Sequence, residues 1–199
     1  MWTTARTLSR LYVRAKGRGR GAGPLPPLFL VTDPERTLHP VRLARRLPKG
    51  AGVIYRAFGA AKADRTAEKL RRVAATRGLI LLIGSGEPRV RMAGAHLPER
   101  LAHRARRFRR TGALVTAAAH GEAAIRRARL AGCDAVLVSA VFESASPSAG
   151  RPMGQVRFAA LVRRAGLPVY ALGGINADTA RRLLRSGAAG LAAVGALAD

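Results

Sequence analysis

From residue 28 onward, short apolar runs recur at similar intervals along the chain. They are rich in Val, Leu, Ile and Ala, and most are continuous rather than alternating. Continuous runs of this length are typical of strands buried on both faces, as in a parallel sheet. The runs span residues 28–32, 52–58, 79–83, 94–97, 113–117, 135–142, 169–173 and 190–195. We therefore expect eight parallel strands.

Amphipathic helical patterns lie between several of these runs. In residues 67–78, Leu70, Val73 and Ala74 share one helical face, and Gly78 has the position of a C-cap. Similar patterns that close on glycine cover residues 121–132, 158–166 and 177–187. The alternation of helical patterns with apolar runs predicts that helices connect the parallel strands.

Eight strands that alternate with helices favour a single (β/α)₈ TIM barrel. We assign this barrel to residues 24–199 and expect its last helix to be truncated, because the sequence ends soon after the eighth run. A length of 199 residues suits one such domain. An open, doubly wound sheet is the main alternative. Residues 28–37 contain no glycine, which argues against a dinucleotide-binding fold.

Residues 1–23 differ in composition from the rest of the chain. They contain six basic residues and no acidic residue, and they end in a Gly- and Arg-rich run. The glycine-rich part predicts a flexible segment. A basic leader without acids also resembles an organelle transit peptide. A mobile tail and a short helix packed on the barrel are the other interpretations.

The chain is strongly basic, with a formal net charge of +25 that comes almost entirely from arginine. We interpret this charge mainly as solvated, Arg-rich helix faces. The functional alternative is an acidic partner, either a phosphorylated metabolite or nucleic acid. Aromatic residues make up only 5% of the chain, so stacking surfaces for nucleic acid are scarce. We therefore expect a small phosphorylated ligand and no specific nucleic acid.

Two further features bear on where the protein works. No apolar run is long enough to span a membrane, so we expect no membrane partner. Cys133 is the only cysteine and cannot form an internal disulfide. Its position before an apolar run predicts a small core residue. These features are compatible with a reducing compartment, and we expect a cytoplasmic protein.

The segment 169–180, VYALGGINADTA, carries the strongest signal for a binding site. An apolar run leads into Gly173 and Gly174, and a helix is expected to begin near Asn176. Glycines allow a ligand to approach the backbone closely, and the start of a helix attracts anions. The next apolar run ends at Val194 and Gly195. These two loops predict a phosphate-binding mouth, and simple turn glycines are the alternative interpretation.

The order of these segments over residues 28–197 resembles thiamin phosphate synthase and its relative TenI. The resemblance is strongest over residues 115–197, from AAAHGEAAIRRARLAG to LGGINADTARRLLRSGAAGLAAVG. It implies a (β/α)₈ barrel that joins a pyrimidine pyrophosphate to a thiazole phosphate and releases pyrophosphate with Mg²⁺. For the TenI branch, it implies isomerisation of a thiazole carboxylate phosphate.

Several residues depart from the synthase pattern. Of the Gln-x-Arg-x-Lys motif that grips pyrophosphate only Arg56 is kept, and Phe58 replaces Lys. The Asn-Asp pair that binds the metal is replaced by Gly84 and Ser85. Glu99 follows the His-Leu motif where a second Asp is expected nearby. We therefore expect no metal site and no cofactor. Mg²⁺ is expected only for an authentic synthase, in which Glu87 or Glu99 would replace the lost ligands.

The thiazole phosphate half of the pattern is better preserved. His120 corresponds to a histidine that TenI uses as acid and base, and Arg56 with Ser146 would orient the substrate. The alternative is that His120 only caps the following helix or closes the end of the barrel. The residues expected to bind substrate or phosphate are Arg56, Ser144, Ser146, Gly173, Gly174, Val194 and Gly195.

The leading hypothesis is therefore a TenI-like protein of thiamin biosynthesis that binds a thiazole phosphate and isomerises it. A divergent thiamin phosphate synthase and a catalytically inactive, phosphate-binding barrel are the alternatives. A homo-oligomer is compatible with each of these hypotheses.

Overall fold

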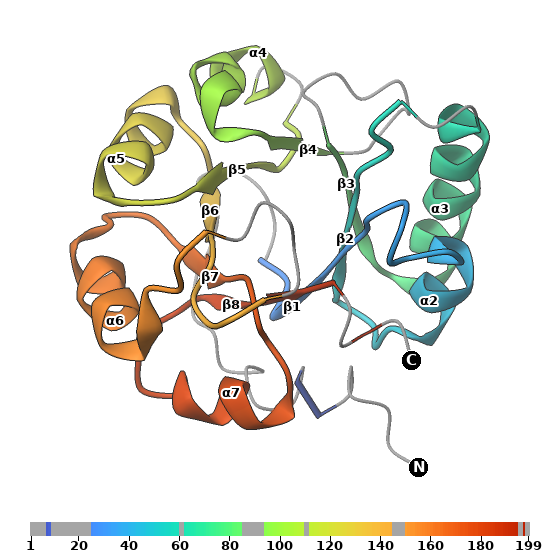
Figure 1. The fold of residues 1–199 in the computed structure, drawn as a ribbon. Helices are drawn as coiled ribbons and strands as arrows, with labels where there is room; N and C mark the ends of the chain where they lie inside the picture. The colour runs from blue at the N-terminus through green and yellow to red at the C-terminus, as the bar shows by residue number, and fades with distance from the viewer. Residues whose placement is uncertain are drawn as a thin grey trace.

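The computed structural model describes residues 7–8, 25–59, 62–84, 94–109, 112–144, 150–194 and 197. Eight strands form a closed barrel in chain order, and every neighbouring pair is parallel (Figure 1). The strands are β1 Leu28–Val31, β2 Gly52–Tyr55, β3 Ile80–Gly84, β4 Gly94–Leu97, β5 Val115–Ala119, β6 Ala135–Val138, β7 Val169–Ala171 and β8 Gly190–Ala193. The predicted (β/α)₈ TIM barrel is confirmed.

Helices surround this barrel (Figure 1). They are α2 Pro40–Arg46, α3 Ala63–Arg77, the 3₁₀ helix η1 Glu99–Arg104, α4 Ala105–Arg109, α5 Glu122–Ala131, α6 Gly154–Arg164 and α7 Ala177–Arg182. Gly78 and Gly132 adopt the left-handed conformation after α3 and α5, as the sequence predicts. The helix predicted over residues 177–187 is shorter than expected, because α7 ends at Arg182 and hydrogen-bonded turns follow it.

The apolar side chains form two layers. The inner layer fills the barrel, where the rings of Phe29 and Tyr170 meet edge to face with centroids 4.9 Å apart. The Tyr170 hydroxyl donates a 2.7 Å hydrogen bond to the Pro26 carbonyl, so its polar atom is satisfied in the core. The outer layer lies between strands and helices and includes Cys133, which is buried. Burial raises the pKa of the Cys133 thiol to about 12, with a smaller contribution from Asp134.

Two expectations concern the ends of the chain. The segment 1–23 lies outside the described residues except for Thr7 and Leu8, and Leu8 is fully buried in the outer layer of the core. The expected truncated helix falls on residues 195–199, of which only Leu197 is described. Within the described parts of the chain, no helix is long and apolar enough to cross a membrane.

Candidate functional site

Arg56 lies at the mouth of the barrel, where the carboxyl ends of the parallel strands meet. It follows β2 directly, and Thr32 and Asp33 follow the neighbouring strand β1. The Nε of Arg56 donates a 2.8 Å hydrogen bond to the Thr32 carbonyl, and its backbone N–H donates to Thr32 Oγ1 at 2.9 Å. A terminal nitrogen of Arg56 lies 3.5 Å from Asp33 Oδ2. These contacts fix the guanidinium of Arg56 in the mouth.

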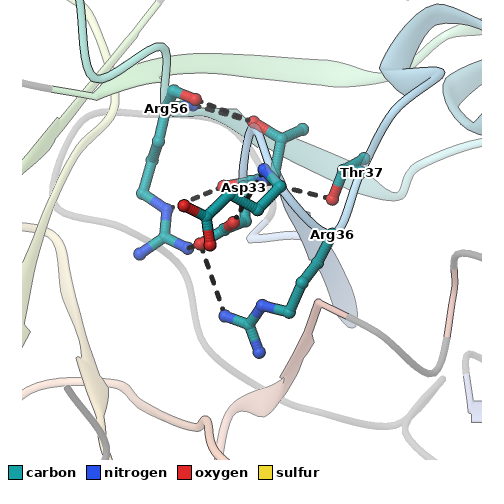
Figure 2. Close-up of polar contacts among 6 residues, drawn as sticks. Asp33, Arg36, Thr37 and Arg56 are labelled. Atoms are coloured by element: carbon teal, nitrogen blue, oxygen red, sulfur yellow. Dashed lines mark hydrogen bonds and ion pairs between the residues drawn. The ribbon is translucent and has the colours of Figure 1, made fainter. Parts of the chain in front are cut away.

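Asp33 is shared between two guanidinium groups (Figure 2). A terminal nitrogen of Arg36 lies 3.4 Å from the same Oδ2 atom that Arg56 approaches. The other oxygen, Oδ1, accepts a 3.2 Å hydrogen bond from the Glu35 backbone. Burial raises the pKa of Asp33, but the Glu35 hydrogen bond and the charges of Arg36 and Arg56 outweigh it and hold the pKa below its ordinary value. Asp33 is therefore an ionised counterion that both guanidinium groups share.

His96 and Thr116 form a neutral polar pair inside the barrel. Both side chains are buried, and His96 Nδ1 lies 2.8 Å from Thr116 Oγ1. Burial, followed by the charge of Arg56, lowers the pKa of His96 to about 3. His96 is therefore uncharged at neutral pH and is a poor base. Gly84 of β3 pairs with His96, and it leaves room for Arg56, because a Cβ on Gly84 would lie 3.1 Å from Arg56 Cγ.

Gly173 and Gly174 lie on the other side of the mouth, after β7, and their conformation requires glycine. Their φ values are +93° and +64°. A Cβ on Gly173 would lie 2.9 Å from Ala140 Cα, and one on Gly174 would collide with the Glu143 carbonyl. The Gly173 carbonyl accepts a 3.1 Å hydrogen bond from the Phe142 amide. Packing against the loop after β6 therefore accounts for both glycines.

The backbone amides of the two glycines and those at the start of α7 differ in whether they are already hydrogen-bonded. At the start of α7, the Asn176 side chain accepts hydrogen bonds from the Asp178 and Thr179 amides at 3.0 and 2.9 Å. These amides belong to a capping box and are not open to an anion, contrary to the expectation for a helix start. The amides of Gly173 and Gly174 donate no hydrogen bond to any described residue. Among the described residues, the amides of Gly173 and Gly174 are therefore donors without an acceptor.

His120 is placed away from the Arg56 cluster. Its Nδ1 lies 2.8 Å from Glu99 Oε2, and its backbone amide donates to the same oxygen at 3.2 Å. Arg127 of α5 approaches the other Glu99 oxygen at 2.7 Å. These residues border an open groove on the outside of the barrel, which is also lined by His103 and Leu130. The structure does not bring the imidazole into contact with Arg56 or the glycines among the described residues.

The other predicted site residues are described only in part. Ser144 is half-buried in the segment that follows β6, and Val194 is half-buried directly after β8. Ser146 and Gly195 lie outside the described residues. The pairing of β7 with β8 brings Val194 to the same end of the barrel as Gly173.

The described carboxylates do not fit a magnesium site. No three His, Cys, Asp or Glu side chains converge in the part of the chain that the structure describes. Both oxygens of Asp33 and both oxygens of Glu99 already accept contacts from arginine, histidine or backbone groups. Mg²⁺ prefers open, oxygen-rich positions. Glu87, the other candidate ligand, lies outside the described residues.

Sequence reasoning did not select Asp33, Arg36 or the pair of His96 and Thr116 as site residues. Asp33 directly follows the first strand and therefore stands at the mouth, but this position alone assigns it no role in binding. Arg36 depends on the turn that follows Asp33, and the pattern of residues does not specify where that turn directs the side chain.

Comparison with known proteins decides the family. Residues 28–197 match the family model described as thiamine monophosphate synthase. The chain belongs to this thiamine monophosphate synthase family. A curated member, the thiamine-phosphate synthase of Roseiflexus sp. (strain RS-1), is 40% identical over 73 residues, which make up 36% of this chain and 31% of that protein. The match thus spans less than a third of that relative.

Solved structures agree with this family at the level of the fold. Thiamine phosphate pyrophosphorylase from Pyrococcus furiosus matches with a TM-score of 0.73 and 22% identity, and the match covers 88% of both chains. A structure described as native KDPGal matches with a TM-score of 0.57 and 14% identity, over 83% of this chain and 81% of the other. At these identities the likeness shows the shared barrel.

Proposed function

We propose that this member of the thiamine monophosphate synthase family binds a thiazole phosphate at the mouth of its barrel. The observation that carries the proposal is the sharing of one carboxylate, Asp33, by the guanidinium groups of Arg36 and Arg56. Guanidinium groups bind phosphate with charge-assisted hydrogen bonds, and Asp33 holds two of them together at the mouth. The family membership supports a thiazole phosphate as the ligand.

The backbone of the opposite loop supplies the second half of the proposed binding site. The amides of Gly173 and Gly174 donate no hydrogen bond to a described residue, and neither residue has a side chain to cover them. Neighbouring amides of this kind can cradle an anion. In this arrangement the phosphate lies between backbone donors on one side and guanidinium groups on the other. Ser144, Ser146, Val194 and Gly195 complete the proposed contacts.

Isomerisation of the thiazole ring is the second candidate function, and the pair of His120 and Glu99 favours it. A carboxylate at Nδ1 orients the imidazole, which leaves Nε2 to exchange a proton. His120 would remove a proton from one ring position and return it to another, with no net change in protonation. Because His120 lies at the rim, this step requires its side chain to turn toward the mouth. The proposed binding involves no metal or other cofactor. We also propose that the protein works in the cytoplasm.

Calorimetric titration tests the binding proposal. The wild-type protein is titrated with thiazole phosphate and with the corresponding alcohol, which lacks the phosphate. We expect saturable binding of the phosphate ester and at least tenfold weaker binding of the alcohol. Arg56→Gln should weaken binding of the phosphate ester, whereas Arg163→Gln, on the exposed side of α6, removes an equal charge and should not. Equal affinities for both ligands would contradict the proposal.

Proton movement is tested separately with the thiazole carboxylate phosphate, followed by NMR in heavy water. We expect wild-type protein to speed the isomerisation and to exchange the ring proton with solvent. His120→Ala should remove this acceleration, and His103→Ala, in the same outer groove, is the matched control. If no acceleration is detected at high protein concentration while the ligand still binds, the inactive binding barrel is the better description.

A further inference from the structure

Phe58 combines two unfavourable features that the fold does not explain. Its φ of +46° places a non-glycine residue in the left-handed region, although Gly59 directly follows it. Its side chain is also 66% exposed, so the ring gains little from burial. A bulky residue in this conformation and an exposed aromatic ring both carry a cost. Such features are typical of positions retained for ligand binding.

The ring of Phe58 contacts the charged cluster at the mouth. The guanidinium carbon of Arg56 lies 5.2 Å from the centroid of the ring, within the range of a cation–π contact. Arg56 is in turn fixed by the Thr32 carbonyl and by Asp33. Phe58 thus stands beside the cation that we propose binds phosphate, and most of its surface faces solvent.

We propose that Phe58, held by Arg56, forms a binding surface for the flat aromatic ring of the ligand. This inference rests on the proposed function, because the phosphate places the ligand at Arg56. Stacking on one aromatic ring strengthens binding by roughly tenfold when the second ring is flat. The surface therefore selects phosphate esters that carry an aromatic heterocycle over esters of the same charge without a ring.

Two ligands, two substitutions of Phe58 and one control substitution test this ring site by calorimetry. The ligands are thiazole phosphate and ethyl phosphate, which keeps the anionic group but has no ring. Phe58→Ala should weaken binding of thiazole phosphate about tenfold and leave ethyl phosphate unchanged. Phe58→Trp should retain the affinity for thiazole phosphate. Leu184→Ala, which removes another exposed apolar side chain, should change neither affinity.

Phe58→Gly separates ligand binding from folding. Glycine tolerates the positive φ of this position, so the melting temperature should stay the same or rise. The affinity for thiazole phosphate should fall as in Phe58→Ala. This combination would mean that the phenylalanine serves the ligand and not the fold.

The possible failures can be distinguished. If wild-type protein binds neither phosphate ester, the proposed function is wrong and the ring site falls with it. If wild-type protein binds both esters and Phe58→Ala leaves the affinity for thiazole phosphate intact, only the ring site is overturned. An equal loss for both ligands would also overturn it, because Phe58 would then act through the position of Arg56.

Discussion

The two sides of the barrel mouth are built in different ways. After β1 and β2, side chains define the surface: Asp33 lies between Arg36 and Arg56. After β7, the backbone defines it, because Gly173 and Gly174 pack against the loop after β6 too closely for any side chain. The glycine side is thus required by the fold, while the charged side consists of partly exposed side chains held by hydrogen bonds and ion pairs. Substitutions on the two sides should therefore separate stability from binding.

The largest expected effect is on the glycine side. Gly174→Ala combines a positive φ with a collision against the Glu143 carbonyl, and we expect a loss of at least about 3 kcal/mol in the free energy of unfolding. Gly59→Ala has a φ of +81° but no atom within 4 Å of the added Cβ, so it should cost about 1 kcal/mol. Gly121→Ala has neither problem, but Gly121 is the N-cap of α5, where Ala is less favourable, so its loss should also be about 1 kcal/mol. Urea unfolding measures all three, and similar losses for Gly174→Ala and Gly59→Ala would contradict close packing.

The next effect concerns the neutral histidine inside the barrel. Because the pKa of folded His96 is about 3, the unfolded chain binds a proton that the folded protein does not, and stability falls as the pH drops below about 6.5. Between pH 7.5 and pH 5 we expect His96 to account for a loss of about 2 kcal/mol. His96→Asn should remove this part of the pH dependence. Identical pH dependence in both proteins would mean that folding does not lower the pKa of His96.

A smaller effect is expected from the charged side, and it should appear in binding. Arg36→Gln removes one of the two cations that share Asp33, so the affinity for thiazole phosphate should fall by about 1 kcal/mol, or about fivefold. The midpoint of urea unfolding should change little, because the side chain is partly exposed and surface ion pairs contribute little to stability. A large loss of stability with unchanged affinity would reverse the assignment of the two sides.

The smallest effect is expected at the outer rim. Burial raises the pKa of Glu99. The hydrogen bonds and charge of His120 and the charge of Arg127 lower this pKa by more, so the net shift is downward. The contribution of Glu99 to stability is therefore present above its unfolded pKa and lost as the pH falls through the folded value. Glu99→Gln should cost about 0.5 kcal/mol at pH 7 and nothing at low pH. The affinity for thiazole phosphate should not change if the ligand binds only at the mouth.

Much of the barrel could be predicted from the sequence, because each strand is buried on both faces and appears as a continuous apolar run. The helices α2 and η1 were not predicted. In α2 only Leu43 and Ala44 are buried, and in η1 only Ala102, so neither segment shows a strong helical period. Some predicted strands extend too far along the chain. β6 and β7 end before the apolar runs that predicted them.

The candidate site was harder to predict than the barrel. Arg56 could be placed at the mouth because it directly follows a strand. The orientation of His120 depends on Glu99, which lies 21 residues earlier in the chain, and no local pattern specifies that contact. The pairing of the α7 amides likewise depends on the Asn176 side chain adopting its capping position. Side-chain contacts between separate loops thus set the limit of the sequence-based prediction.

A crystal structure with bound thiazole phosphate measures the position of the phosphate directly. We expect its oxygens within about 3 Å of the Gly173 and Gly174 amide nitrogens, with the guanidinium of Arg56 on the opposite side. Phosphate density in the outer groove beside His120, with the Gly173 and Gly174 amides facing only water, would contradict binding at the mouth.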